Sequence, residues 1–425
     1  MTGSTGRAGS SGEVRAMQRI LIIVENLPVP FDRRVWAEAT TLRAAGYTVS
    51  VICPKGKDAE ASHEEIDGIH VYRHPLPLEA KGALGYVLEY GSALFWEALL
   101  TLKVWRRHGI DALQACNPPD TIFLIGAVLK LFGKRFVFDH HDINPELYEA
   151  KFGRRDFFWR LLVWLERASF ATADISIATN ESYRRIAIER GRMDPDKVVV
   201  VRSGPKLERL RILPPDPALR KGRAHLVGYV GVIGAQEGLD LLLESVRHIV
   251  RTRGRTDIQF GIVGSGPAFD DIVALAAQMG VADYVTFTGR VPDDTLLAML
   301  NTADVCVNPD TPNEMNDKST MNKIMEYMAL GKPIVQYDLT EGRFSAQEAS
   351  LYARNGDPAN FGDKILTLID DKEARARMGA FGRRRVETEL SWPHEAPKLL
   401  AAYARLFAGF PAVSKTGAPA EDPAR

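Results

Sequence analysis

Short runs of β-branched and apolar residues alternate with amphipathic helical patterns along most of this chain. This alternation is typical of parallel strands connected by helices, so we predict an α/β protein with doubly wound parallel sheets. The strands expected in the first half are Arg19–Val24, Thr48–Cys53, His70–Tyr72, Ala112–Ala115, Arg135–Asp139, Ile175–Ala178 and Val198–Val201. Those expected in the second half are Leu226–Val230, Gln259–Val263, Val285–Thr288, Val305–Val307 and Ile334–Tyr337.

A stretch without periodicity, rich in proline and charge, separates the two series at residues 202–225. The 425 residues are enough for two domains with separate cores. We therefore predict two Rossmann-like domains over residues 18–205 and 206–391, with a flexible leader at 1–17 and a polar tail at 411–425. Ligands of such sheets collect beyond the carboxyl ends of the strands, which makes the cleft between the two halves the expected active site.

Composition excludes several classes of protein. The 54 basic and 54 acidic side chains cancel, which gives no support to nucleic-acid binding through a basic body. The three cysteines, Cys53, Cys116 and Cys306, are too far apart in sequence for a metal knuckle or redox pair. They fit a reducing compartment. The leader lacks the apolar segment of a signal peptide, and no run of about 18 apolar residues occurs, so we predict a cytoplasmic protein.

The segment at residues 316–333, NDKSTMNKIMEYMALGKP, is predicted to form one short helix that binds phosphate. Ser319 or Thr320 is the expected N-cap, and Gly331 ends the helix before the next strand. The expected buried stripe is Met321, Ile324, Met325 and Met328. Free amides of the first turn, the helix dipole and Lys323 would meet a diphosphate, with Glu326 on the same face. The alternative is a solvated pair of Lys323 and Glu326 on an ordinary amphipathic helix.

A second polar cluster, Asp139-His140-His141-Asp142, lies at the end of an expected strand. Neighbouring strand residues point to opposite faces, and a metal site needs a third ligand that the sequence does not supply. A metal at this cluster is therefore not expected. A structural histidine that orients a neighbouring carboxylate is one interpretation of His141.

The loop after the first strand lacks the glycine-rich turn of dinucleotide-binding proteins, which argues against an NAD site. Instead it carries Asp32-Arg33-Arg34 at the start of an expected helix. Arg33 and Arg34 could clamp an acceptor phosphate with paired donors, or could form surface salt bridges.

Four motifs, in order along the chain, resemble the family 4 glycosyltransferases, which have the GT-B fold. They are residues 229–240, YVGVIGAQEGLD; residues 263–267, VGSGP; residues 287–291, FTGRV; and residues 326–333, EYMALGKP. Asp32-Arg33-Arg34 is similar to a triplet that a subset of bacterial members carries. Each motif alone is weak, but four in register are fairly specific.

The resemblance implies a retaining transferase that uses a nucleoside-diphosphate sugar and a last helix, here residues 392–410, that returns to the first domain. His141 and Asp142 would lie near the transferred sugar and the acceptor, and Arg33 and Arg34 would bind the acceptor. The donor would be bound by Gly231, Val232, Gly234, Gly289, Arg290, Val291, Lys318, Ser319, Thr320, Lys323 and Glu326. No Asp-x-Asp motif appears where a metal-dependent transferase needs one, so no metal or other cofactor is expected.

Three positions depart from the family pattern. An arginine and a lysine that grip the donor diphosphate align with Val232 and Glu237, and the first glutamate of the family's pair aligns with Lys318. We expect Lys323, Lys318 and the amides of Ser319 and Thr320 to compensate for the lost cations.

Two aromatic-rich helical stretches, residues 86–105 and 152–170, bear on the acceptor. In the second, arginines surround Phe157, Phe158, Trp159 and Trp164, which suits contact with lipid headgroups at the inner face of the cell membrane. Leu161, Leu162 and Leu165 are expected in the core, and the arginines and Trp159 on an exposed face. The alternative is that both helices pack on the sheet of the first domain and their aromatic side chains belong to its core.

Together these features predict transfer from a UDP-sugar to a glycan or polyprenyl-linked acceptor in surface or secreted polysaccharide assembly. The alternatives are a non-hydrolysing sugar-nucleotide epimerase and a sugar-nucleotide-binding scaffold.

Overall fold

The structure is a computed structural model that describes residues 17–75 and 83–408, with side-chain burial undescribed at residues 83–90. The predicted tail and the predicted leader, apart from Met17, lie outside the described residues. The chain divides into two compact units. The first unit comprises residues 1–114 and 128–135, and the second comprises residues 115–127 and 136–425.

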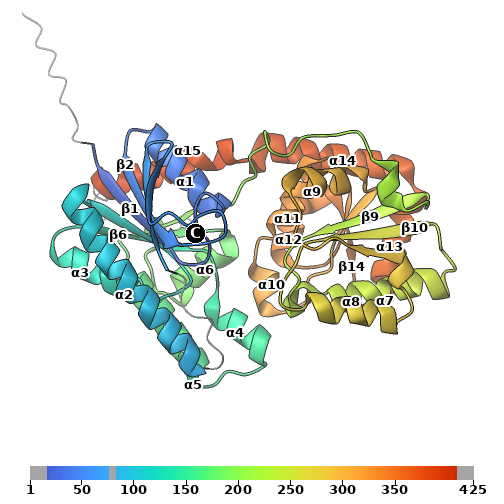
Figure 1. The fold of residues 1–425 in the computed structure, drawn as a ribbon, viewed down its shortest axis with the longest axis horizontal. Helices are drawn as coiled ribbons and strands as arrows, with labels where there is room; N and C mark the ends of the chain where they lie inside the picture. Colours follow the sequence, from blue (N-terminus) through green and yellow to red (C-terminus); the bar gives the residue numbers. More distant parts are fainter. Residues whose placement is uncertain (1–16, 76–82, 409–425) are drawn as a thin grey trace, which may run out of the picture. The chain divides into compact units, whose positions relative to one another are not determined.

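One sheet has eight strands in the order β3-β4-β2-β1-β5-β6-β7-β8 (Figure 1). The strands are β1 (Arg19–Val24), β2 (Thr48–Pro54), β3 (His63–Ile66), β4 (Ile69–His74), β5 (Ala112–Cys116), β6 (Arg135–His140), β7 (Ile175–Ala178) and β8 (Val198–Val200). β3 pairs with β4 in antiparallel register, whereas the pairs β1–β2, β2–β4, β6–β7 and β7–β8 are parallel.

The other sheet has six strands in the order β11-β10-β9-β12-β13-β14, and every pair in it is parallel. Its strands are β9 (His225–Val230), β10 (Ile258–Val263), β11 (Val285–Phe287), β12 (Val305–Asn308), β13 (Ile334–Tyr337) and β14 (Ser350–Ala353). The strand order reverses between β9 and β12. This topological switch point is where ligands of open α/β sheets bind.

Most helices lie between the strands in sequence, and α13, α14 and α15 follow the last strand. They are α1 (Arg33–Ala44), α2 (Ala83–Arg107), α3 (Phe123–Leu131), α4 (Asn144–Phe152), α5 (Phe157–Thr172), α6 (Glu181–Glu189), α7 (Leu239–Arg247), α8 (Phe269–Gln278), α9 (Asp293–Thr302), α10 (Glu314–Lys318), α11 (Asn322–Ala329), α12 (Thr340–Ala346), α13 (Pro358–Asp370), α14 (Lys372–Arg385) and α15 (Trp392–Ala408). In the part of the chain that the structure describes, no helix is long and apolar enough to cross a membrane.

Helices cover both faces of the six-stranded sheet (Figure 1). On one face, α7, α8 and α13 bury apolar side chains such as Leu243, Ile272 and Ile365 against the strands. On the other face, α9 and α11 contribute a second core that includes Leu300 and Met325. Both faces of these strands are therefore buried from solvent. For this reason the strands appear in the sequence as short apolar runs and not as alternating patterns. The prediction of doubly wound parallel sheets is confirmed.

Two strands were missed in the sequence. β3 reads His-Glu-Glu-Ile and β14 reads Ser-Leu-Tyr-Ala, and both are edge strands of only 4 residues. β3 is an edge strand with two charged residues, so its sequence has the polar composition of a loop. Neither strand has an apolar run long enough to be recognised.

The single helix predicted over residues 316–333 is wrong, because two helices occupy this region. α10 ends at Lys318, where Ser319 is its C-cap, and α11 begins at Asn322 after Met321. The predicted buried stripe is confirmed for Ile324, Met325 and Met328, while Met321 is only partly buried. Tyr327 is also fully buried. Its hydroxyl is satisfied there, because it accepts a 2.9 Å hydrogen bond from the amide of Val230.

The helix α5 exposes more apolar surface than its sequence predicts. Phe157 is 72% exposed and Trp164 is 59% exposed. Leu161, expected in the core, is also exposed, whereas Trp159, expected on the surface, is half-buried. Exposed arginines flank this face at positions 154, 155, 160 and 167. We call the exposed residues Phe157, Phe158, Leu161 and Trp164 the α5 apolar face.

The C-terminal helix α15 contacts β8 of the eight-stranded sheet within the second unit. The carboxylate of Glu395 on α15 accepts a 2.9 Å hydrogen bond from the amide of Arg202, and the guanidinium of Arg405 donates to the carbonyl of Asp196. These contacts join the end of the chain to the segment around β8.

Candidate functional site

The loops after β9 and β12 approach each other closely at the switch point. Gly238 has a φ of +66°, and a Cβ atom there would lie 2.0 Å from the carbonyl oxygen of Pro309. Only glycine fits this position, because the left-handed conformation and the close backbone contact both exclude a side chain. Glu237 comes just before Gly238, and Asp310 comes just after Pro309. The close approach of the two loops therefore brings these two carboxylates near each other, where both pair with Lys323.

Lys323 joins these two loops from α11. Its Nζ atom lies 2.7 Å from a carboxylate oxygen of Glu237 and 2.9 Å from one of Asp310. The side chain of Lys323 is 10% exposed and that of Asp310 is 1% exposed. Burial lowers the pKa of Lys323, but the Asp310 and Glu237 carboxylates and the Tyr229 hydroxyl outweigh it and raise this pKa well above its usual value. Lys323 is therefore a buried, permanently charged group, and the alternative of a solvated Lys323–Glu326 pair is wrong.

Glu326, one turn further along α11, pairs with Arg209 instead of Lys323. The guanidinium of Arg209 also lies 3.3 Å from the carboxylate of Asp293. Both side chains of the Arg209–Glu326 pair are partly buried. Arg209 comes from the stretch predicted as an irregular linker, and its place beside Glu326 had no signal in the sequence because the two residues are 117 positions apart.

The other predicted donor residues lie on loops that follow β9, β11 and α10. Gly231, Val232 and Gly234 follow β9, and the Val232 side chain is 57% exposed. After β11, Gly289 accepts a 3.0 Å hydrogen bond from the amide of Gly264, next to exposed Arg290 and half-buried Val291. Lys318 pairs with Glu314 within α10.

Ser319 and Thr320 do not cap α11, and this prediction is wrong. The Ser319 hydroxyl donates to the carbonyl of Met315 at 2.7 Å, and the Thr320 hydroxyl accepts from the Asn180 side chain at 3.0 Å. Both side chains hold the α10–α11 loop in place. Within the described residues, no side chain caps α11. Ile324 donates its amide to the Met321 carbonyl at 3.0 Å, which leaves the amides of Asn322 and Lys323 as the ones that an anion would meet.

His141 follows β6 and is oriented by a buried carboxylate. Its Nε2 atom donates to Asp139 at 2.8 Å, and the Asp139 side chain is fully buried. With Nε2 donating to the carboxylate, a neutral ring carries its lone pair on Nδ1. Its neighbour His140 points to the other side and lies 3.3 Å from buried Glu166, as expected for adjacent strand residues.

Asn117, which the sequence did not single out, fixes the loop that carries His141. Its side-chain oxygen accepts from the amides of His141 at 2.6 Å and Asp142 at 3.2 Å. Its amide group donates to Asp120 at 2.9 Å and to the carbonyl of Asp142 at 2.7 Å. An asparagine directly after a strand and before two prolines was the available signal, because such a position favours a side chain bonded to the backbone.

Buried Tyr183 connects this loop to the α10–α11 loop. Its hydroxyl lies 3.0 Å from the Ser319 hydroxyl. Burial and the nearby Asp142 carboxylate raise the pKa of Tyr183, so the phenol stays neutral. The second unit thus links His141 and Asp142 to the segment before α11.

The two arginines of the first loop differ in their surroundings. Asp32 caps α1 by accepting from the amide of Val35 at 3.0 Å. Arg34 lies 3.1 Å from fully buried Glu38 and is itself 8% exposed, so it is not the surface salt bridge considered from sequence. Arg33 is exposed. Acceptor binding by Arg33 and Arg34 stays a prediction.

Two family descriptions match this chain. "Glycosyltransferase Family 4" matches residues 32–209, and "Glycosyl transferases group 1" matches residues 224–371. Among curated proteins, the chain is 30% identical over 155 residues to alpha-D-kanosaminyltransferase of Streptomyces kanamyceticus, covering 36% of this chain and 38% of that protein. The chain spans about half the length, 38% to 58%, of such relatives.

Solved structures show the same fold. Sucrose-phosphate synthase from Thermosynechococcus elongatus aligns with a TM-score of 0.74 and 20% identity, covering 92% of this chain and 99% of that chain. Anabaena HepE, in complex with UDP and glucose, aligns with a TM-score of 0.68 and 14% identity, covering 91% and 99%.

We predict that Asn117→Ala lowers the free energy of unfolding by about 2–4 kcal/mol, because it leaves several buried backbone and side-chain groups without partners. Urea denaturation measures this change. Asn355→Ala is the matched control, since exposed Asn355 donates one hydrogen bond to the Asp338 carbonyl and should cost less than about 1 kcal/mol. Equal losses in both variants would contradict the role given to Asn117.

Proposed function

Because the chain belongs to the family 4 glycosyltransferases, which have the GT-B fold, we propose that it transfers a sugar from a UDP-sugar to a glycan or polyprenyl-linked acceptor with retention of configuration. The product would enter a cell-surface or secreted polysaccharide. The observation that carries this proposal is the buried cation Lys323, with Glu326 on the same helix, at the switch point of the six-stranded sheet.

The nucleotide would be held by α11 and the loop after β9. Glu326 is suited to accept hydrogen bonds from the ribose hydroxyls, with Arg209 holding the carboxylate in position before the donor arrives. The uncapped first turn of α11 and Gly234 would offer backbone amides to the diphosphate, whereas the amide of Gly231 already donates to the Val263 carbonyl at 3.1 Å. UDP is the favoured nucleotide because the similar Anabaena structure contains it.

The charge at the switch point accounts for one of the departures from the family pattern. The family's lysine before the second glycine is replaced by Glu237, and Lys323 reaches this glutamate from α11. The cation is thus supplied by another element and is partly neutralised by Glu237 and Asp310. A diphosphate would compete with these two carboxylates for Lys323, so Glu237 would lower the affinity for the donor.

We propose that donor binding needs no metal ion. Among the described residues, the groups of side chains that are close enough to share an ion contain no residue of α11 or of the loops after β9 and β12. The leaving diphosphate would be stabilised by helix amides and Lys323. Turnover that is lost in EDTA and restored by magnesium or manganese would contradict this.

His141 would contribute its Nδ1 lone pair to the reacting hydroxyl or to the transferred sugar, with Asp139 fixing the ring. The α5 apolar face and its flanking arginines would bring the enzyme to an acceptor at the inner face of the cell membrane. Arg33 and Arg34 remain the proposed acceptor contacts.

The epimerase and scaffold alternatives make different forecasts. An epimerase would convert a sugar nucleotide without an acceptor, and a scaffold would bind UDP without turnover. Incubation of the protein with labelled UDP-sugars and extracted lipid acceptors separates all three.

We predict that His141→Ala lowers transfer by about 100-fold or more while UDP affinity barely changes, because a positioned polar group is lost beside the reacting centre. Turnover, UDP titration and melting temperature are measured on one preparation. Near-normal turnover in a stable, UDP-binding variant would remove His141 from catalysis and favour the scaffold.

We predict that Glu237→Gln tightens UDP binding about 5-fold, on the order of 1 kcal/mol, because one of two anions that compete for Lys323 is removed. Calorimetric titration measures the affinity. Glu348→Gln, at an exposed position in the same unit, is the control and should leave it unchanged. Weaker binding in Glu237→Gln would show that Lys323 does not meet the diphosphate.

We predict that the double variant Phe157→Ala, Trp164→Ala loses most of its binding to vesicles containing anionic lipid, because the α5 apolar face is removed while its arginines remain. Co-sedimentation with vesicles measures this. A double variant on the exposed part of α14, Arg377→Ala with Arg384→Ala, controls for a general loss of positive charge. Equal sedimentation of wild type and the α5 variant would contradict membrane contact through this face.

A further inference from the structure

A buried cluster in the first unit plays no part in the proposed transfer. Glu25 follows β1, His74 is the last residue of β4, and Glu97 lies on α2. One ligand atom of each side chain lies within 4.8 Å of the others. Glu97 and His74 are buried and Glu25 is 11% exposed.

The polar atoms of this cluster converge, and His74 pairs with Glu25 while Glu97 is left without a partner in the described part of the chain. Neither carboxylate oxygen of Glu97 has a hydrogen-bond partner among the described residues. His74 Nε2 lies 2.9 Å from Glu25 Oε2, yet both atoms are left without a hydrogen bond of acceptable geometry. Burying a carboxylate without a partner costs several kcal/mol in typical proteins. The three side chains thus converge on one point, with a buried carboxyl that has no partner among the described residues.

The surroundings fit a metal ligand set. His74 Nδ1 donates to the Pro75 carbonyl at 2.9 Å, which directs Nε2 toward Glu25. Histidines that bind metals typically donate their other nitrogen to a carbonyl or carboxylate in this manner. Burial, together with the Glu25 carboxylate, raises the pKa of Glu97 to about 8. A bound cation would remove the cost of ionising this carboxyl.

We propose that Glu25, His74 and Glu97 bind one divalent transition-metal ion of the zinc type. One imidazole and two carboxylates are suitable ligands for such an ion, whereas Mg²⁺ prefers an all-oxygen octahedron. Ligand atoms around a tetrahedral zinc lie about 3.3 Å apart, so His74 Nε2 and Glu25 Oε2, at 2.9 Å, would separate slightly and Glu97 would rotate toward them. The ion would tie β1, β4 and α2 together, as a structural metal does.

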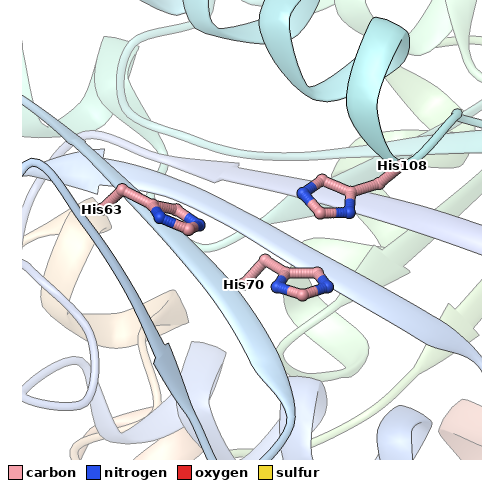
Figure 2. A group of neighbouring side chains, drawn as sticks. All are labelled: His63, His70 and His108. Atoms are coloured by element: carbon pink, nitrogen blue, oxygen red, sulfur yellow. The ribbon is translucent and has the colours of Figure 1, made fainter.

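A histidine cluster elsewhere in the first unit is less suited to this role. Figure 2 shows His63, His70 and His108, with the rings of His70 and His108 stacked at 3.9 Å and 18°. One nitrogen of each ring lies within 4.8 Å of the others, so these histidines must be removed to isolate zinc binding at the buried cluster. His108 Nε2 already lies 2.8 Å from the Tyr72 hydroxyl. This cluster therefore supplies the matched control.

The experiment titrates Zn²⁺ into the full chain after dialysis against a chelator, with calorimetry and thermal unfolding as readouts. The wild type and the His63→Ala, His70→Ala double variant should both bind zinc at the buried cluster and melt at a higher temperature with it. Glu97→Gln, made in the double variant, should weaken zinc binding at least 10-fold and abolish the thermal shift. Glu25→Gln in the same background repeats the test if Glu97→Gln does not fold.

Two results would overturn the proposal. One is a double variant that binds no zinc at micromolar concentrations, which would leave Glu97 as a carboxyl that holds a proton. The other is zinc binding that survives both Glu97→Gln and Glu25→Gln. Neither readout depends on transferase activity, so the metal site and the proposed function stand or fall separately.

Discussion

The pairing of Lys323 with Glu237 and Asp310 is the interaction on which the rest of the candidate site depends. It joins the loop after β9, the loop after β12 and the start of α11 at the one place in the six-stranded sheet where the strand order reverses. Removing a buried cation from two carboxylates would leave uncompensated charge, which is strongly destabilising. The same contact keeps the uncapped amides of α11 and the side chain of Glu326 at the edge where a nucleotide binds in sheets of this kind.

A second set of buried polar contacts places His141. Asn117 holds the backbone of the loop, Asp139 holds the ring, and Tyr183 connects the neighbouring Asp142 region to Ser319. These residues sit at the ends of strands or the starts of helices, so rigid elements determine their positions. The functional groups are therefore prearranged by hydrogen bonds that do not involve a ligand. This network gives a physical reason for the role proposed for His141.

Much of the fold could be predicted because buried parallel strands leave short apolar runs in the sequence. The strands at Arg19–Val24, Ile175–Ala178 and Ile334–Tyr337 have the predicted bounds, whereas the polar edge strand β3 left no such run. The site was harder to predict, because its partners are set by tertiary contacts. From the sequence, Glu237 replaces a cation of the family pattern. In the structure, Lys323, 86 positions away, lies beside it and supplies a cation. Ser319 and Thr320 look like helix caps, but their hydroxyls bond to Met315 and Asn180 instead.

The central claim is that α11 holds the nucleotide, and titration of UDP into Glu326→Ala tests it most directly. Loss of hydrogen bonds from the ribose to a charged carboxylate should weaken binding by about 1.5–3 kcal/mol. Glu348→Ala controls for the loss of one surface carboxylate in the same unit. The account predicts weaker UDP binding in Glu326→Ala alone, with an unchanged melting temperature in the control. UDP affinity equal to that of the wild type in a folded Glu326→Ala protein would contradict it.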